Sequence, residues 1–547
     1  MPRPRFASPS SPLPSTASIT PSVRRSALRR LPPLALALPL LLAGGCRAES
    51  LPPPAAESLH WPVPPAPQVD PLTPEIWVAL ASRLGPSQPL ALRSAQGLLT
   101  LVAPDGARYQ SPSLVLHWRQ EPLEPPQRIR RQVLGPFASY ESAAEAAARW
   151  RRAGADPVIG YPRDWEVWAA ADAPLPAALG PARLVEQVHQ QRAVLELRRD
   201  SGPVPLTGPL TLEAPGGLRW NNGAKAGSGV FAGPFRLLPD AHGGWSLVET
   251  VPLERYLQGV VPHEIGAGSP PAALAAQAVL ARTYALRNLA RFAVDGYHLC
   301  ATVQCQVYAD PRTAGPAVRQ AIDATRHQVL AWQGRPITGV YHASNGGVSA
   351  GFEEVWSGEP VPYLRPRVDG DGALQQRFPL PLAAAQVGPL LSTSGFHGAG
   401  HPRFRWTRTL AAGEMRQALQ AQAPQLGTPE RVSVLERGPS GRVLALEIAG
   451  SGGGGQAGEQ RVVLRLDAIR RTFRQLPSTL FVVEPAGPGS WRFVGGGFGH
   501  GAGLSQAGAI DLAQRGWTLQ RILEHYYPGT QLQPLSALGA GLTVQAP

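Results

Sequence analysis

Residues 251–264 have the sequence V-P-L-E-R-Y-L-Q-G-V-V-P-H-E, and this stretch decides how the rest of the chain is interpreted. Glu264 directly follows the apolar run Val260-Val261-Pro262. From Ser269 the chain continues S-P-P-A-A-L-A-A-Q-A-V-L-A-R-T-Y-A-L, which predicts a helix with Ser269 as its N-cap and prolines in its first turn. Apolar side chains recur there at helical spacing, so one face should be buried. A carboxylate beside apolar residues at a helix entrance suits a general acid, because desolvation raises its pKa.

The same stretch holds a second glutamate, Glu254. It stands where a strand ends or a helix begins, and a glutamate there normally caps the helix or forms an ion pair. A single glutamate is most often a solvated surface charge. Position therefore favours Glu264, rather than Glu254, as the chemically active carboxylate.

Five segments, in this order, resemble the stage II sporulation protein D / amidase-enhancer (SpoIID/LytB) family, over roughly residues 245–535. The resemblance implies cleavage of peptidoglycan glycan strands by a lytic transglycosylase, with Glu264 as the catalytic acid. The five segments are V-P-L-E-R-Y-L-Q-G-V-V-P-H-E, A-A-L-A-A-Q-A-V-L-A-R-T-Y-A-L, C-Q-V-Y, G-F-G-H-G-A-G-L-S-Q-A-G-A and H-Y-Y-P-G-T.

Glycoside hydrolases usually need two carboxylates, whereas a lytic transglycosylase can use one. The C6 hydroxyl of N-acetylmuramic acid attacks its own C1, and one glutamate acts first as acid and then as base. The product is a 1,6-anhydro end, and no cofactor is required. The enhancer branch of the family implies an alternative, a non-catalytic wall-binding protein that stimulates an N-acetylmuramoyl-L-alanine amidase.

His298, Cys300 and Cys305 form a second candidate site. Two cysteines in an oxidising compartment favour a local disulfide. Two thiolates with a histidine also suit a structural zinc ion, although no fourth ligand is evident. Some members of the resembled family carry zinc at a comparable cluster. Both alternatives stay open, and either would hold the loop before Tyr308, which we count among the substrate-binding candidates.

Further substrate-binding candidates come from two later segments. Y-H-A-S-N-G-G offers Ser344 and Asn345 as hydrogen-bonding groups, with His342 as a structural residue. G-F-G-H-G-A-G-L-S-Q supplies glycines that let a polymer approach the backbone, and a histidine expected to position substrate or support charge near Glu264. Trp356 either lines the groove or is packed in the core. The candidates in the second segment are Gly499, His500, Gly501 and Gln506.

Residues 1–46 predict an export signal, because arginines precede a short apolar run that ends in A-G-G-C. Cys46 is either the lipidated residue of a lipoprotein or lies near a simple cleavage site. The mature protein is therefore expected in the periplasm or cell envelope. Residues 47–75 are rich in proline and alanine and predict an extended tether or a leader without a role.

Residues 76–200 predict an N-terminal α+β region, whose clearest part is strand, turn, helix and strand over 130–170. This part, with G-P-F-A-S-Y-E-S-A, resembles the sporulation-related repeat (SPOR), a module that binds glycan strands stripped of peptide. Trp165 and Trp168 could stack on sugars, but core packing is the commoner role of tryptophan. Residues 201–245 predict a β-rich lead-in, 246–535 the SpoIID/LytB-like domain and 536–547 a tail.

The chain as a whole is predicted to be a multi-domain α+β protein. It has 51 Lys and Arg against 38 Asp and Glu, a net charge of +13, and Lys225 is its single lysine. No basic helix or arginine stripe with interleaved aromatic residues occurs, which argues against nucleic-acid binding. The excess charge could hold anionic envelope polymers or lipid headgroups.

Overall fold

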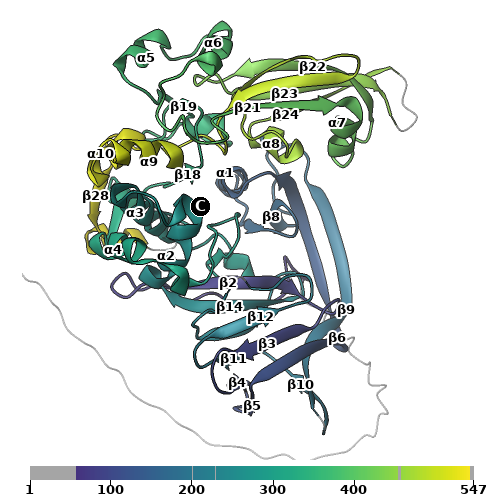
Figure 1. The fold of residues 1–547 in the computed structure, drawn as a ribbon. Helices are drawn as coiled ribbons and strands as arrows, with labels where there is room; N and C mark the ends of the chain where they lie inside the picture. The colour runs from purple at the N-terminus through teal and green to yellow at the C-terminus, as the bar shows by residue number, and fades with distance from the viewer. Residues whose placement is uncertain (1–56, 200, 228, 454–457, 543–547) are drawn as a thin grey trace, which may run out of the picture. The chain divides into compact units, whose positions relative to one another are not determined.

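A seven-stranded sheet carries the segment that ends in Glu264 (Figure 1). This computed structural model describes residues 57–199, 201–227, 229–453 and 458–542. The sheet contains strands from before residue 200, from 201–245 and from after 245, so the predicted boundaries at 200 and 245 do not divide the chain into separate sheets. In sheet order, the strands are β15 (Leu299–Cys300), β2 (Glu75–Leu84), β14 (Trp245–Pro252), β13 (Phe235–Pro239), β11 (Leu210–Glu213), β4 (Leu99–Val102) and β5 (Arg108–Ser111).

A second sheet, of eight strands, is dominated by two long antiparallel strands, β6 (Ser113–Phe137) and β9 (Arg183–Arg199). The predicted strand–helix–strand unit is part of this sheet: β6 is followed by α1 (Tyr140–Arg152), β7 (Val158–Gly160) and β8 (Trp165–Ala170), with β8 paired to both β6 and β7. Ser139 caps α1 by accepting a hydrogen bond from the Ser142 amide, and Gly154 follows the helix with a φ of +92°. Trp165 and Trp168 are buried, so their role is core packing. The SPOR identity of this unit stays a prediction.

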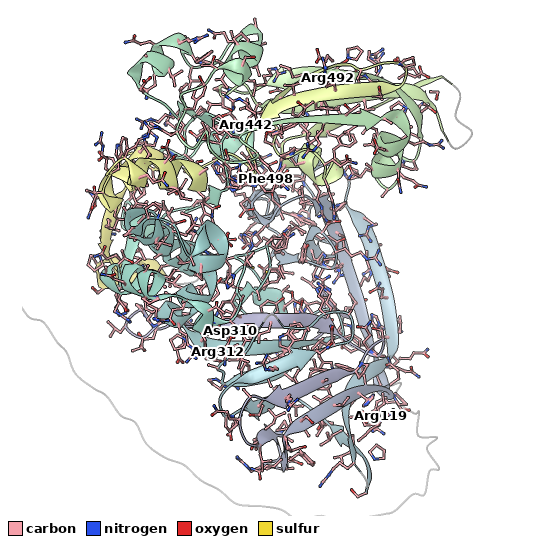
Figure 2. All side chains as sticks on the ribbon, viewed as in Figure 1. Arg119, Asp310, Arg312, Arg442, Arg492 and Phe498 are labelled. Atoms are coloured by element: carbon pink, nitrogen blue, oxygen red, sulfur yellow. The ribbon has the colours of Figure 1, made fainter. Side chains whose placement is uncertain are left out.

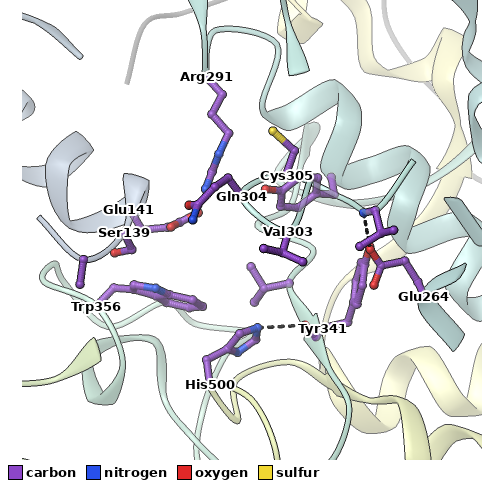
Figure 3. A pocket seen from close by; sticks show the side chains of 14 residues that line it. Ser139, Glu141, Glu264, Arg291, Val303, Gln304, Cys305, Tyr341, Trp356 and His500 are labelled. Carbon is purple, nitrogen blue, oxygen red and sulfur yellow. Dashed lines mark hydrogen bonds and ion pairs between the residues drawn. The ribbon is translucent and has the colours of Figure 1, made fainter. Parts of the chain in front are cut away.

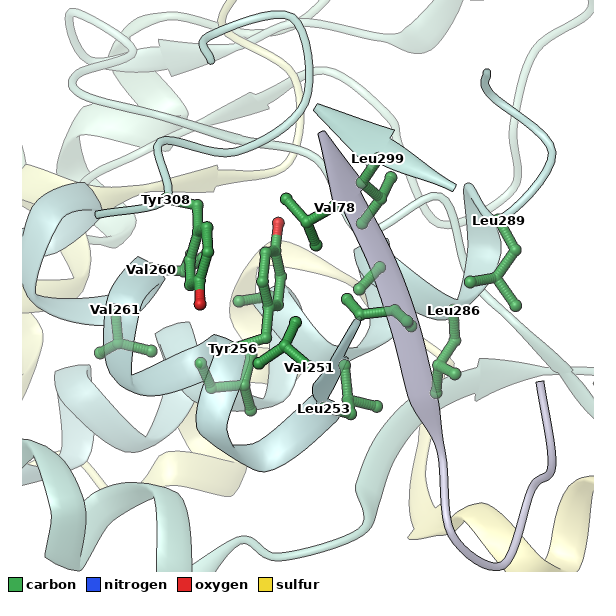
Figure 4. Close-up of a cluster of buried hydrophobic side chains, with 14 of the residues drawn as sticks. Val78, Val251, Leu253, Tyr256, Val260, Val261, Leu286, Leu289, Leu299 and Tyr308 are labelled. Atoms are coloured by element: carbon green, nitrogen blue, oxygen red, sulfur yellow. The ribbon is translucent and has the colours of Figure 1, made fainter. Parts of the chain in front are cut away.

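Two helices follow β14 and cover the seven-stranded sheet. α2 (Leu253–Val261) and α3 (Pro271–Arg287) pack against it through a cluster that includes Val78, Val251 and Tyr256 (Figure 4). Each such side chain contributes about 1.5–3 kcal/mol by leaving water. α3 is buried on almost every side, as expected for a helix at the centre of a core.

The start of α3 corrects one detail of the prediction. Prolines do stand in the first turn, but the residue before the helix is Pro270 and Ser269 is not the N-cap. The Ser269 hydroxyl donates instead to the Ile265 carbonyl, at 2.8 Å. It therefore closes the preceding turn, which contains Glu264, rather than the helix.

A separate hydrophobic core lies within residues 406–493. Here the sequence predicts a helix around residues 411–422 and two strands, R-V-L-A-L-E-I-A and R-V-V-L-R-L. The helix is present as α7 (Ala412–Leu419), and the strands β23 (Val443–Gly452) and β24 (Glu459–Arg465) pair as an antiparallel hairpin. β22 (Leu426–Arg437) extends this hairpin to a three-stranded sheet, and β21 (Arg405–Ala411) and β26 (Ser490–Gly496) pair beside it.

Arg442 ties this part to the segment before it (Figure 2). Its guanidinium is buried and donates to the carbonyls of Val348 and Asn345, both at 2.9 Å. After the separate core the chain returns to the region around Glu264, where β27 (Leu504–Ser505) pairs in parallel with β18 (Tyr341–His342). It then continues through α9 (Gln506–Gln514) and α10 (Leu519–Tyr526).

The predicted tether is part of the fold from Glu57 onward. Glu57 and Ser58 pair with β6, and the Trp61 amide donates to the Ala241 carbonyl. The described residues from Glu57 onward belong to one compact unit. The predicted export signal and Cys46 lie outside the described residues. Within residues 57–542, with the gaps given above, no helix is long and apolar enough to cross a membrane.

Candidate active site

Glu264 lies in a pocket of about 290 Å³ whose walls come from distant parts of the chain (Figure 3). One wall is the segment from α2 to Val307. A second is formed by Val340, Tyr341 and Trp356, and His500 lies beside them. The far wall is the first turn of α1, from the N-terminal region. The pocket is therefore built by the N-terminal region and the SpoIID-like region together.

The backbone around Glu264 departs from a regular helix. α2 ends at Val261, and Pro262–Gly266 form a single π-helical turn that carries the glutamate. Pro262 has no N–H, so it cannot continue the hydrogen-bond ladder of α2, and the wider turn begins at this residue. Such turns occur frequently at functional sites.

The environment of Glu264 holds its proton more firmly than water does. The side chain is half-buried, and burial raises the pKa of its carboxyl group. One hydrogen bond opposes this effect: the Val307 amide donates to Oε1 at 2.8 Å. Glu264 forms no ion pair with any residue that the structure describes. These features are those of a general acid that can also be stabilised after it loses its proton.

Tyr341 stands beside Glu264 in the pocket (Figure 3). Its hydroxyl accepts a hydrogen bond from the Gln306 side chain at 2.8 Å, and Gln306 in turn accepts one from Tyr256 at 3.1 Å. Burial raises the pKa of Tyr341 well above its ordinary value, with the nearby Glu264 charge adding to the effect. The phenol is therefore a neutral group held in place from behind. Sequence reasoning missed it, although it directly precedes His342.

His500 lies in the same pocket but does not supply the charge that we expected. Its Nε2 donates to the Tyr341 carbonyl at 2.9 Å, and its Nδ1 accepts from the Ala502 amide at 3.1 Å. Burial lowers its pKa to about 4, so the ring is neutral near neutral pH. The imidazole stacks near Trp356, with ring centres 5.0 Å apart. It therefore shapes the wall, and its two nitrogens are already used.

The far wall is held by an ion pair between Glu141 of α1 and Arg291, which follows α3. The two groups are 2.9 Å apart, and the Arg291 guanidinium also lies over the rings of Tyr140 and Trp165, at 4.4 and 5.2 Å. Burial disfavours the Arg291 charge, but Glu141 outweighs it and raises the arginine pKa. No local pattern could have linked these residues, because they are far apart in the sequence.

Most of the predicted substrate-binding residues are structural. Ser344 and Asn345 are almost fully buried. The Asn345 amide donates to Asp369 at 2.6 Å and its oxygen accepts from Gly347 at 2.9 Å, which leaves it no free group for a sugar. His342 is buried and bonds the Ala502 carbonyl, as a structural residue should.

The glycines of the last motif approach their own chain rather than a polymer. A Cβ on Gly499 would lie 2.7 Å from the His342 side chain, and one on Gly501 would lie 2.4 Å from the Arg442 guanidinium. Both have positive φ, +118° and +92°, which also requires glycine. The prediction of a glycan-facing backbone at these two positions is wrong.

Gln506 and Tyr308 also lie outside the pocket. Gln506 is buried at the start of α9 and bonds the Gln277 side chain at 3.3 Å. Tyr308 is buried under the loop, where its hydroxyl donates to Glu249 at 2.9 Å. Of the substrate-binding candidates only His500 lines the pocket. Trp356, which the sequence placed either in the groove or in the core, also lines it.

The structure does not assemble the predicted zinc ligands. The Trp77 amide donates to His298 Nδ1 and the other ring nitrogen bonds the Pro67 carbonyl, both at 2.9 Å, so neither nitrogen is free. Among the residues that the structure describes, no group of three histidine, cysteine or acidic side chains could hold a metal ion. The donor set therefore does not fit zinc.

The two cysteines are nevertheless adjacent. Both thiols are free, and the Cys300 amide donates to Cys305 Sγ at 2.9 Å. Burial opposes ionisation of the Cys300 thiol, but hydrogen bonds from Cys305 and Thr302 lower its pKa to about 7. A disulfide between them stays a prediction. Cys305 lines the same pocket as Glu264.

Comparisons with known proteins agree with this site. The family model described as "Stage II sporulation protein" matches residues 241–332, which include Glu264, α3 and both cysteines. Over these residues the chain is similar to the SpoIID/LytB family, as the five sequence segments predicted. A domain of unknown function, DUF8618, matches residues 350–503, the stretch between β18 and β27 that contains the separate core.

Three relatives match about half of this chain. An uncharacterized protein of Brachyspira hyodysenteriae is 28% identical, over 52% of this chain and 68% of its own length. Stage II sporulation protein D of Bacillus subtilis is 26% identical, over 53% and 77%. The amidase enhancer of Bacillus subtilis is 28% identical over 50% of this chain, and only 40% of its own length is covered.

Proposed function

We propose that this protein is a peptidoglycan lytic transglycosylase that uses Glu264 as its single acid and base. The observation that carries the proposal is the contrast between the two carboxylates of the pocket. Glu264 has a raised pKa and forms no ion pair within the described part of the chain, whereas Glu141 is bound to Arg291. One carboxylate is thus free for proton transfer and the other is committed to structure, which fits a one-glutamate reaction better than a two-carboxylate hydrolysis.

In this reaction the protonated Glu264 gives its proton to the glycosidic oxygen as the bond to C1 of N-acetylmuramic acid breaks. The Val307 N–H stabilises the carboxylate that remains. The carboxylate then removes the proton of the C6 hydroxyl, whose oxygen forms the new bond to C1. Glu264 is protonated again, and the product carries a 1,6-anhydro end.

The test is mass spectrometry of purified glycan strands after incubation with the protein. The wild-type chain should produce 1,6-anhydro-N-acetylmuramic ends, and Glu264→Gln should produce none. Glu524→Gln is a matched control, because it makes the same change at an exposed position outside the pocket. Hydrolysed ends, or equal activity of wild type and Glu264→Gln, would refute the proposal.

A second function is supported by the relative named amidase enhancer. In that case the pocket binds glycan, and the protein stimulates an N-acetylmuramoyl-L-alanine amidase without cutting the strand. An amidase assay separates the two functions, since enhancement should survive Glu264→Gln.

Export to the cell envelope and lipidation of Cys46 belong to the same proposal, because the substrate lies outside the cytoplasm. The mass of the mature N-terminus would test both.

A further inference from the structure

A second pocket adjoins the candidate active site. It has a volume of about 350 Å³, within the range of roughly 300–1,000 Å³ that is typical of small-ligand sites. The two pockets share the lining residues Glu141, Tyr284 and Val340. The second pocket is therefore a direct neighbour of the one that holds Glu264.

The second pocket is formed from three sides. One side is a face of α1, with Ala144 and Ala148. The facing side is the end of α3, where Arg287 is exposed and forms no ion pair with any described residue. The loop after Phe352 closes the third side, with Ser357 among its residues.

The chemistry of this lining suits an uncharged, hydroxyl-rich occupant. The lining combines the hydroxyls of Thr338 and Ser357 and the amide of Asn288 with three aromatic rings. Two of its carboxylates are already paired, Glu141 with Arg291 and Glu145 with Arg149. The remaining Glu359 and Arg287 carry opposite charges, so neither a strong anion nor a strong cation is selected. N-acetylated sugars offer hydroxyl and amide groups of this kind. The polar and charged lining side chains are Tyr140, Glu141, Glu145, Tyr284, Arg287, Asn288, Thr338, Ser357 and Glu359.

The α1 side of the pocket is fixed in place. The Glu141–Arg291 pair holds the first turn of α1, and the Ser357 amide donates to the Ser142 hydroxyl at 3.3 Å. The N-terminal region is thus joined to the loop after Phe352 as well as to the end of α3. A preformed wall of this kind lowers the ordering cost of binding.

We propose that this second pocket is a glycan subsite, which binds the sugar units next to the bond that Glu264 cleaves, and that α1 forms one wall of it. The inference rests on the proposed function. The subsite gives the N-terminal region a direct part in substrate binding. The binding face of α1 lies against the SpoIID-like region, so the N-terminal region does not bind glycan as an independent module.

Ala148→Trp tests the subsite, because it fills the pocket from the α1 side. Ala153→Trp is the matched control: it makes the same substitution at the exposed end of the same helix. Both are made in the full chain with Glu264→Gln, so that binding is measured without cleavage. The probes are soluble glycan oligosaccharides of one, two and three disaccharide repeats, titrated by calorimetry. Ser357→Tyr, on the third side of the pocket, is a second variant if the first does not fold.

The Glu264→Gln protein should bind the longer oligosaccharides more tightly than the single repeat. Ala148→Trp and Ser357→Tyr should weaken binding of the longer ones by about tenfold and leave the single repeat unchanged. Equal affinities for Ala148→Trp and Ala153→Trp, with Ser357→Tyr also unaffected, would overturn the subsite, as would no binding of any oligosaccharide. If the length dependence holds but the wild type makes no anhydro ends, the lytic function fails and the subsite stands.

Discussion

Glu254→Gln should destabilise the protein strongly, although the side chain keeps its size. Glu254 stands at the start of α2 and receives two hydrogen bonds from Arg282 of α3, at 2.8 and 2.6 Å. The guanidinium is fully buried and its remaining recorded partner is the Gln328 carbonyl, at 2.9 Å. The substitution removes the negative charge and leaves a cation in the core.

The expected cost is about 3–5 kcal/mol of unfolding free energy, the usual result of breaking a buried ion pair from one side. Replacing both residues by methionine should recover most of this loss, because no charge then remains buried. Asp323→Asn is the control, since it breaks an exposed pair with Arg326 and should cost less than about 1 kcal/mol.

The measurement is urea unfolding followed by tryptophan fluorescence, with all four proteins compared at one pH. Two results would refute the reasoning. Glu254→Gln could prove as harmless as Asp323→Asn, or the double methionine variant could be as unstable as the single one. Either result would mean that Arg282 does not depend on its partner for its stability in the core.

Three further predictions follow from other buried groups. Burial and the neighbouring Asp240 raise the pKa of Asp295 to about 7. The stability that this proton contributes is therefore complete below about pH 4, the ordinary pKa of an aspartate, and is lost as the pH rises through 7. Urea unfolding should therefore show Asp295→Asn gaining about 2–3 kcal/mol on the wild type between pH 5 and pH 8, and a constant difference would contradict this. Gly501→Ala should lower the free energy of unfolding by about 1–3 kcal/mol, because the new methyl group meets the buried guanidinium of Arg442, while the folded fraction still binds glycan normally. Weaker glycan binding at full stability would instead support contact between Gly501 and the polymer. Thiol labelling should find Cys300 and Cys305 joined by a disulfide under oxidising conditions, and metal analysis should find no bound zinc. One equivalent of zinc that is lost on Cys305→Ser would show that the two cysteines bind a metal ion instead.

Local patterns in the sequence predicted the elements well. The apolar spacing after Pro271 predicted the central helix, and the runs R-V-L-A-L-E-I-A and R-V-V-L-R-L predicted the two strands of the β23–β24 hairpin. Glu254 was expected to cap or pair, and it pairs. Each of these signals depends on residues that are close together in the chain, so no knowledge of the tertiary structure was needed.

The pocket was predicted less well, because its residues meet only in three dimensions. The Glu141–Arg291 pair joins residues that no sequence motif connects. Glycine-rich and Ser-Asn segments look alike whether they contact a ligand or their own chain, and Gly501 and Asn345 do the latter. The zinc alternative failed for a similar reason, since the spacing of His298 from the cysteines does not reveal that backbone groups bind both of its nitrogens.

The pairing of β18 with β27 has a consequence for the order in which the molecule is made. Residues 139 and 500 line the same pocket, and the strands that bring the last wall into place end at Ser505. A growing chain that has reached only residue 332, the end of the segment that matches the SpoIID model, carries Glu264 but lacks His500 and the β18–β27 pairing that positions it. Because domains fold from the N-terminus during synthesis, the separate core within 406–493 can form before this closure. A nascent or truncated polypeptide therefore lacks part of the pocket, and Glu264 meets its complete surroundings only in the finished chain.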